Sequence, residues 1–208
     1  AGLAYLAVSW NSERLIFHES ALAAEGIGET RLAPLLASLR SARPTLKITL
    51  VGHSLGARMV LATLQESPGK AAESAVLLEG AVNRDALVPG REAGFGSFPG
   101  ASTHADRIAN LHSSQDDVLR LTYDTAMTSP ALGREGADRD RNGGQYPSVA
   151  LEGMSVNTDA LSAAYRNPMS LGVGPGRIVN IDASAVVSGH SNVFELPVYD
   201  LIWRMTRE

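Results

Sequence analysis

The sequence has 208 residues, a formal net charge of −4 and no cysteine, and 44% of its residues are hydrophobic and 19% charged. This length suits one domain with a single core, which we take to span residues 1–208. No apolar stretch approaches the roughly 20 residues of a membrane span, and the acidic balance disfavours nucleic acid and anionic lipid as partners. Without cysteine, disulfides, thiolate metal sites and a cysteine nucleophile are excluded, whereas the cellular compartment stays open.

Apolar runs alternate with helical patterns along the whole chain. This alternation predicts an α/β fold, with a mostly parallel sheet flanked by helices on both faces. The helical patterns occupy residues 29–42, 57–65, 117–127 and a segment from about residue 192 to the C-terminus. The strand-like runs are residues 3–9, 47–51, 75–78, 107–111 and 177–181.

Two stretches, residues 82–106 and 129–176, are rich in Gly, Pro and Ser and show little periodicity. We expect both to be loop or lid excursions that leave the ends of sheet strands, where α/β folds bind ligands. The second contains "DRDRNGG", which is similar to the start of a calcium loop with Asp138, Asp140 and Asn142 as oxygen ligands. Val149 stands where such a loop has its bidentate Glu, so a solvated turn is favoured over a cation site.

Residues 52–56, Gly-His-Ser-Leu-Gly, fit the pattern G-x-S-x-G. In that pattern a serine occupies a strained turn from strand to helix, and the small neighbours Gly52 and Gly56 permit the turn. The preceding "KITLV" supplies a strand, and the following "ARMVLATLQES" supplies a helix whose N-terminus favours an oxyanion. The context therefore predicts that Ser54 is a nucleophile.

A serine hydroxyl is a poor nucleophile unless a base takes its proton. Of the five histidines, His190 follows the last strand-like run and precedes the last helix. That is the place of the base when the chain order is Ser, acid, His. His53 adjoins Ser54, but we expect its side chain to point away on the turn. A satisfied loop histidine is the alternative for His190.

The acid that orients the base should follow the preceding strand. In "RIANLHSSQDDVLRL", Asp116 and Asp117 come a few residues after the fourth apolar run. Either aspartate could instead favour the N-terminus of the next helix. We prefer Asp116 as the acid and keep Asp117 as second choice.

These motifs together resemble the α/β-hydrolase superfamily, in particular bacterial serine hydrolases of esterase/lipase type. The resemblance rests on "VSWNS", "GHSLGAR", "SSQDDVL" and "GHSNV" and spans nearly the whole chain. It implies that Ser54 is the nucleophile, Asp116 the orienting acid and His190 the general acid/base.

The turn from strand to helix at residues 52–56 is called the nucleophile elbow in that superfamily. The sequence departs from the superfamily before this elbow, because one convincing strand precedes the elbow strand where the superfamily usually has four. We therefore expect N-terminal strands to be missing from this chain, and a separate or cleaved N-terminal segment to complete the sheet. The Leu55 N–H should form half of the oxyanion hole. The other half would come from outside this sequence or, less favourably, from Asn11 or Ser12.

The expected activity is hydrolysis of a small-molecule carboxylic ester through an acyl-enzyme, with no metal or organic cofactor. A thioesterase, acyltransferase or peptidase would use the same triad. An alternative of another class is a catalytically silent hydrolase-like domain that binds a ligand or partner.

Overall fold

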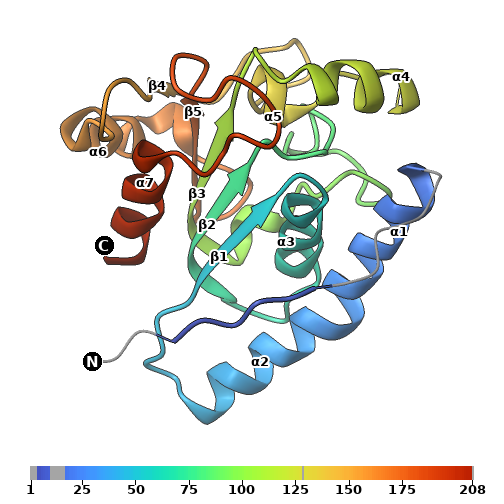
Figure 1. Cartoon of the computed structure of the whole chain (residues 1–208). Helices are drawn as coiled ribbons and strands as arrows, with labels where there is room; N and C mark the ends of the chain where they lie inside the picture. Colours follow the sequence, from blue (N-terminus) through green and yellow to red (C-terminus); the bar gives the residue numbers. More distant parts are fainter. Residues whose placement is uncertain (1–3, 10–16, 128, 208) are drawn as a thin grey trace.

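A computed structural model describes residues 4–9, 17–127 and 129–207. Its centre is a parallel sheet of five strands in the order β1-β2-β3-β5-β4, so the predicted α/β class is confirmed (Figure 1). Four of the predicted runs lie within or overlap its strands. The strands are β1 (Thr49–His53), β2 (Ala72–Leu78), β3 (Ala105–His112), β4 (Ser148–Ala150) and β5 (Arg177–Asp182).

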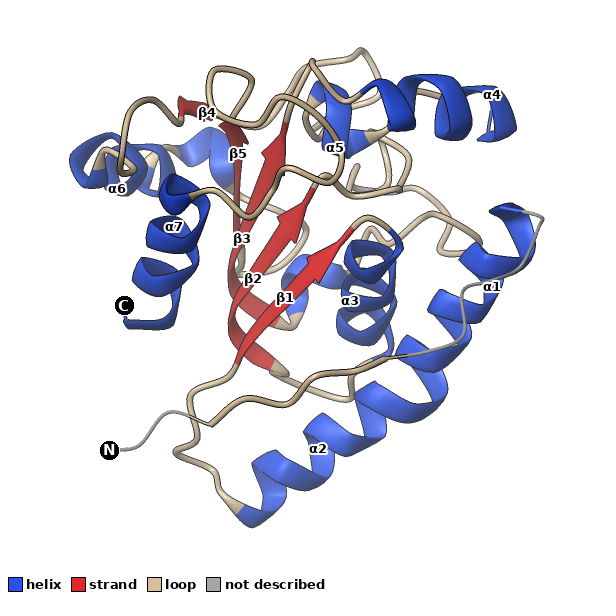
Figure 2. Ribbon diagram, in the orientation of Figure 1, coloured by secondary structure: helices blue, strands red, loops and turns tan. Residues whose placement is uncertain are grey.

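Helices cover both faces of the sheet (Figure 2). On one face α3 lies against the strands and α1 packs on α3, whereas α6 and α7 cover the other face. None of the helices in the described ranges is long and apolar enough to cross a membrane. The α-helices are α1 (Phe17–Ile27), α2 (Ala33–Ala42), α3 (Leu55–Glu66), α4 (Asp124–Met127), α5 (Leu132–Glu135), α6 (Thr158–Arg166) and α7 (Leu196–Arg207).

Shorter helical turns join some of these elements. A π-helical segment links α1 directly to α2, so the expected helix 29–42 is the second half of a longer rod (Figure 1). A second π-helical segment leads into α4. The π-helical segments are Gly28–Leu32 and Leu119–Tyr123, and the 3₁₀ turns are Ala101–Thr103 and Pro168–Ser170.

The core consists of two apolar layers, one on each face of the sheet. In β2, Ala75 and Leu77 belong to the layer under α3, and Val76 and Leu78 belong to the layer under α6 and α7. Successive side chains of a strand point to opposite faces. A strand that is covered on both faces therefore reads as a continuous apolar run, which is why the sequence pattern revealed it.

The prediction of a strand at residues 3–9 is wrong for its described part. Residues 4–9 form neither helix nor strand, and Tyr5 and Leu6 expose 87% and 71% of their surface. An apolar sequence becomes a strand only when a neighbour pairs with its backbone. In the described part of the chain, β1 pairs on one edge only, with β2.

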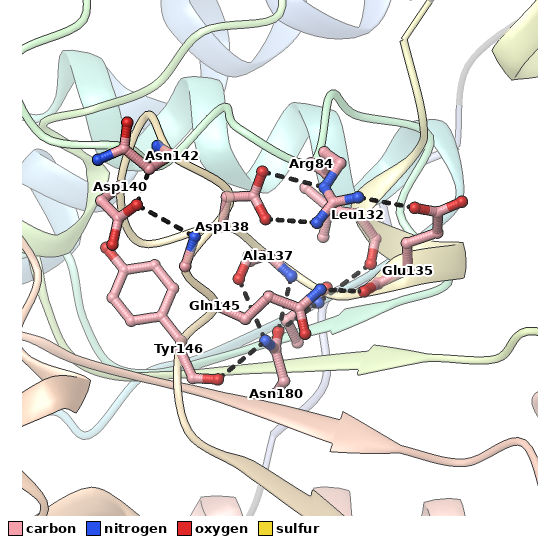
Figure 3. A network of polar contacts seen from close by, with 12 residues as sticks. Arg84, Leu132, Glu135, Ala137, Asp138, Asp140, Asn142, Gln145, Tyr146 and Asn180 are labelled. Atoms are coloured by element: carbon pink, nitrogen blue, oxygen red, sulfur yellow. Dashed lines mark hydrogen bonds and ion pairs between the residues drawn. The ribbon is translucent and has the colours of Figure 1, made fainter.

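The excursion at residues 129–176 contains more structure than its composition indicated, namely α5, β4 and α6. Polar contacts tie its first part to Arg84 of the 82–106 excursion and to Asn180 of the sheet (Figure 3). The Arg84 guanidinium donates to both carboxylate oxygens of Asp138, at 3.0 and 2.7 Å, and to Glu135 at 2.8 Å. The buried Asn180 side chain of β5 accepts from Ala137 N–H at 2.8 Å and donates to the Tyr146 carbonyl at 3.3 Å. The 82–106 excursion contains one 3₁₀ turn.

Candidate active site

Ser54 is the single residue between β1 and α3. Its backbone angles are φ 55° and ψ −118°, a conformation that L-residues with a side chain rarely adopt. Two backbone hydrogen bonds to the end of β2 and the loop after it fix the turn. Ser54 N–H donates to the Leu78 carbonyl at 3.0 Å, and the Ser54 carbonyl accepts from Ala81 N–H at 3.1 Å. The strained turn projects the hydroxyl from the carboxyl end of the sheet.

The two glycines of the elbow have different roles. A Cβ on Gly52 would lie 2.3 Å from the carbonyl oxygen of Gly56, so a side chain there is incompatible with the turn. A Cβ on Gly56 would meet no atom within 4 Å. The first glycine is therefore required by packing, whereas the second is not.

Three predicted residues from distant parts of the chain meet at this turn. The Oγ atom of Ser54 lies 2.9 Å from Nε2 of His190, and Nδ1 of His190 lies 2.6 Å from Oδ2 of Asp116. Asp116 follows β3, and His190 lies in the loop between β5 and α7. The arrangement allows a proton to pass from the hydroxyl to the imidazole while the carboxylate fixes the imidazole tautomer.

The structure separates the two candidate acids. Asp116 is fully buried, and its Oδ1 accepts the Leu119 N–H at 2.8 Å while Oδ2 contacts His190. The Asp117 side chain is 74% exposed and pairs with Arg120 at 2.9 Å. Asp117 therefore makes a surface ion pair, and Asp116 alone of the two contacts the histidine.

The expectation that His53 points away from the site is wrong. Its ring packs against the His190 ring with centroids 4.8 Å apart, and its Nε2 lies 2.8 Å from the His190 carbonyl oxygen. Because a carbonyl only accepts, His53 Nε2 carries the hydrogen of this bond. Burial and the neighbouring His190 lower the pKa of His53, so the ring is neutral and fixes the backbone of the histidine loop.

The first N–H groups of α3 have no acceptor within the helix, as at any helix N-terminus. Leu55 is the first residue of α3 and follows Ser54 directly. Its N–H is thus available to an oxyanion that forms on a carbonyl attacked by Ser54. Asn11 and Ser12, the less favoured sources of a second donor, lie outside the described residues.

Sequence reasoning missed Glu79, which lies beneath the triad. Its side chain is fully buried, and no hydrogen-bond donor contacts either carboxylate oxygen in the described structure. Burial and the adjacent Asp116 raise the pKa of Glu79 to about 8. The available signal was its place in "AVLLEG", since a carboxylate at the end of the strand beside the elbow strand lies where such folds hold functional groups.

Ligand atoms of His53, Glu79 and His190 lie within 4.8 Å of one another, close enough to be considered for a metal ion. His53 Nε2 is engaged by a carbonyl, and His190 contacts Ser54 and Asp116 through its two nitrogens. An ion would have to displace these contacts. The geometry therefore favours proton transfer over metal coordination at this cluster.

The carboxylates of the calcium-like motif at residues 138–144 also pair with groups of the chain itself. Arg84 binds Asp138 (Figure 3), and Asp140 pairs with Arg139 at 2.8 Å. Asp140 Oδ1 also accepts the N–H groups of Asn142 and Gly144, each at 3.0 Å. Both carboxylates of the motif are satisfied by the chain itself, as expected for a turn.

The surface beside the triad is apolar. Phe194 exposes 65% of its surface, and its ring centroid lies 6.4 Å from that of His53 and 6.4 Å from that of Tyr199 in α7. Leu196 between them is 63% exposed. A cavity of about 670 Å³ lies elsewhere, between β4 and α6, and no triad residue lines it. We take the triad as the candidate site because it combines strain, burial and directed hydrogen bonds.

No protein-family model matches this chain, and none of the curated proteins matches its sequence. The functional argument therefore depends on the motifs and on the geometry of the site.

Proposed function

We propose that this protein is a serine hydrolase of the α/β-hydrolase type that cleaves carboxylic esters through an acyl-enzyme. The observation that carries the proposal is the pair of contacts made by His190, 2.9 Å to Ser54 Oγ and 2.6 Å to Asp116 Oδ2. Packing alone does not require a strained backbone at Ser54 or a buried acid that contacts the base. Both features serve a serine that acts as a nucleophile.

In the proposed reaction, Ser54 Oγ attacks the ester carbonyl carbon while His190 Nε2 takes the hydroxyl proton. The carbonyl oxygen becomes an oxyanion that accepts the Leu55 N–H, and the Asp116 carboxylate stabilises the imidazolium through Nδ1–H. Collapse expels the alcohol, which takes the proton from His190. Water then attacks the acyl-serine with the same base and releases the carboxylic acid.

The exposed apolar side chains of Phe194, Leu196 and Tyr199 favour an ester with an apolar acyl or alcohol group. Contact with these side chains would remove apolar surface from water on both sides, at roughly 25 cal/mol per Å². We therefore expect kcat/KM to rise with acyl length across a nitrophenyl ester series.

The direct test is labelling with a fluorophosphonate probe, followed by mass spectrometry of the labelled peptide. We expect one adduct on Ser54 and ester turnover in the wild type. The variant Ser54→Ala should lose both, with a rate reduction on the order of 10⁴-fold or more. Turnover that persists in Ser54→Ala would overturn the assignment.

A catalytically silent hydrolase-like binding domain is the alternative that the same labelling experiment separates from an enzyme. Failure of the wild type to react with the probe would favour this candidate. A thioesterase or peptidase would instead react with the probe and prefer a thioester or an anilide of the same acyl group.

A further inference from the structure

The backbone at Glu79 is in the left-handed region, with φ 43°, directly after β2. Such a position favours Gly or Asn, because other side chains are strained there. The chain places glutamate at this position although the next residue is Gly80. A turn alone does not need a carboxyl group, so the side chain itself calls for an explanation.

The surroundings of the Glu79 carboxyl group are unfavourable for a second negative charge. The group is fully buried, and neither oxygen has a donor in the described structure. A Glu79 carboxylate oxygen lies within 4.8 Å of a His190 ring nitrogen, and His190 in turn contacts Asp116, so the two carboxyl groups are neighbours. His53 Nε2 lies 3.9 Å from Glu79 Oε2. His53 is not a counter-ion, because burial lowers its own pKa. Two neighbouring buried carboxyl groups favour holding one proton between them over carrying two charges.

Asp116 has room for one more donor. Its Oδ1 accepts the Leu119 N–H and its Oδ2 contacts His190, and each carboxylate oxygen has two lone pairs. A protonated Glu79 satisfies its own hydroxyl by donating to this carboxylate, which remains the anion that His190 needs.

We propose that Glu79 is a positioning residue that carries the shared proton, donates it in a hydrogen bond to Asp116, and so holds that carboxylate and its single charge against His190. The chain of contacts then runs from Glu79 through Asp116 and His190 to Ser54. The catalytic consequences of this inference rest on the proposed hydrolase function. The presence of the proton on Glu79 does not depend on that function.

The consequence for pH follows from the groups that face Glu79. They are His53 at the end of β1, Asp116 after β3 and His190 before α7, and Gly133 of α5 packs against the Glu79 backbone. Loss of the shared proton, near pH 8, places two adjacent negative charges below His190. They repel each other and disturb the geometry of Asp116, so that this carboxylate no longer holds the His190 ring in line with Ser54.

The test compares two uncharged variants of similar size, Glu79→Gln and Glu79→Met. The Gln amide can donate to Asp116 at every pH, and the Met side chain cannot donate. At pH 7 we expect E79M to reduce kcat about tenfold or more with KM little changed, and E79Q to reduce it by about threefold or less. Above pH 8 the wild type should lose kcat/KM while E79Q keeps an alkaline plateau.

Equal kcat values and equal pH profiles for the wild type and both variants would overturn the proposal. If E79M does not fold, the alkaline limb of E79Q decides alone: a limb identical to that of the wild type overturns the positioning role.

A second measurement does not need activity. Urea unfolding of wild type and E79Q between pH 5 and 7.5 should show E79Q gaining stability over wild type as pH rises, since in this range the unfolded wild type releases the Glu79 proton while the folded protein keeps it. A constant difference would show that Glu79 ionises normally and overturn the shared proton. If Ser54 fails to react with the probe while this difference grows with pH, the hydrolase proposal fails and the proton assignment stands.

Discussion

Asp116 and Asp117 are neighbours in the sequence with opposite environments. The first is fully buried with its carboxylate held by the Leu119 N–H, and the second is 74% exposed beside Arg120. A buried carboxylate in contact with an imidazole selects which ring nitrogen carries the proton. A solvated carboxylate near a surface arginine contributes little, about 0–1 kcal/mol.

This contrast predicts the outcome of a matched pair of substitutions. Asp116→Asn removes the charge that stabilises the imidazolium and permits the wrong His190 tautomer, so kcat should fall on the order of 10³–10⁴-fold. Asp117→Asn should leave kcat within about twofold. Steady-state ester hydrolysis by both purified variants checks the prediction. A comparable loss in D117N, with both variants folded, would contradict the assignment of the acid.

At the scale of elements, the elbow depends on the close approach of β1 to α3. The missing side chain of Gly52 permits this approach, since a Cβ would lie 2.3 Å from the Gly56 carbonyl. The helix that follows begins immediately at Leu55, so a shift of this junction would move the Leu55 N–H together with Ser54.

The two glycines of the motif should therefore respond differently to alanine. Gly52→Ala is expected to destabilise the fold by about 2–4 kcal/mol, in the upper range for overpacked sites, and to abolish probe labelling. Gly56→Ala adds a methyl group to open space in the first turn of a helix, where Ala is favoured over Gly by up to about 1 kcal/mol. Urea unfolding measures both changes. If G56A is destabilised as much as G52A, the steric account of the motif is wrong.

The elements differed in how far the sequence could predict them. The strands β2, β3 and β5 are covered on both faces and appear as continuous apolar runs. β4 has three residues with alternating exposure inside a Gly-, Pro- and Ser-rich stretch, too short for a periodic signal. Residues 4–9 are as apolar as a typical strand but form no strand in the structure. Strand formation depends on a pairing partner, which composition does not reveal.

The site was predictable where it follows a local rule. Ser54 belongs to a turn with a short sequence signature, and His190 and Asp116 lie near strand ends in the expected order. The stretch "AVLLEG" marks Glu79 as the end of a strand, but the burial of its carboxyl group and the orientation of His53 follow from tertiary packing, which no local pattern encodes. The sequence analysis preferred Asp116 over Asp117, but the structure was needed to distinguish them, because adjacent residues in a loop share the same sequence context.

For the whole molecule, stability depends on pH through titratable groups distributed over several elements. Burial lowers the pKa values of His53, His104 and His112. A group whose pKa is lower in the folded state stabilises the fold fully above its unfolded value, about 6.5 for histidine. That contribution is lost as pH falls toward the folded pKa, because the unfolded chain binds the proton first. Glu79 acts in the opposite direction, since its pKa is raised.

Substitution of His112 gives the clearest test of how the free energy of unfolding falls at acidic pH. It ends β3, and its Nδ1 is buried without a hydrogen-bond partner, so a proton there would have no acceptor. In His112→Gln this titration is absent, while the contributions of the other histidines and of Glu79 are common to both proteins. We expect the free energy of unfolding of the wild type to fall more steeply than that of H112Q between pH 6.5 and 5, by up to roughly 1.4 kcal/mol per pH unit. Urea unfolding at each pH measures the difference, and parallel curves would mean that His112 accepts a proton as readily in the folded protein as in the unfolded chain.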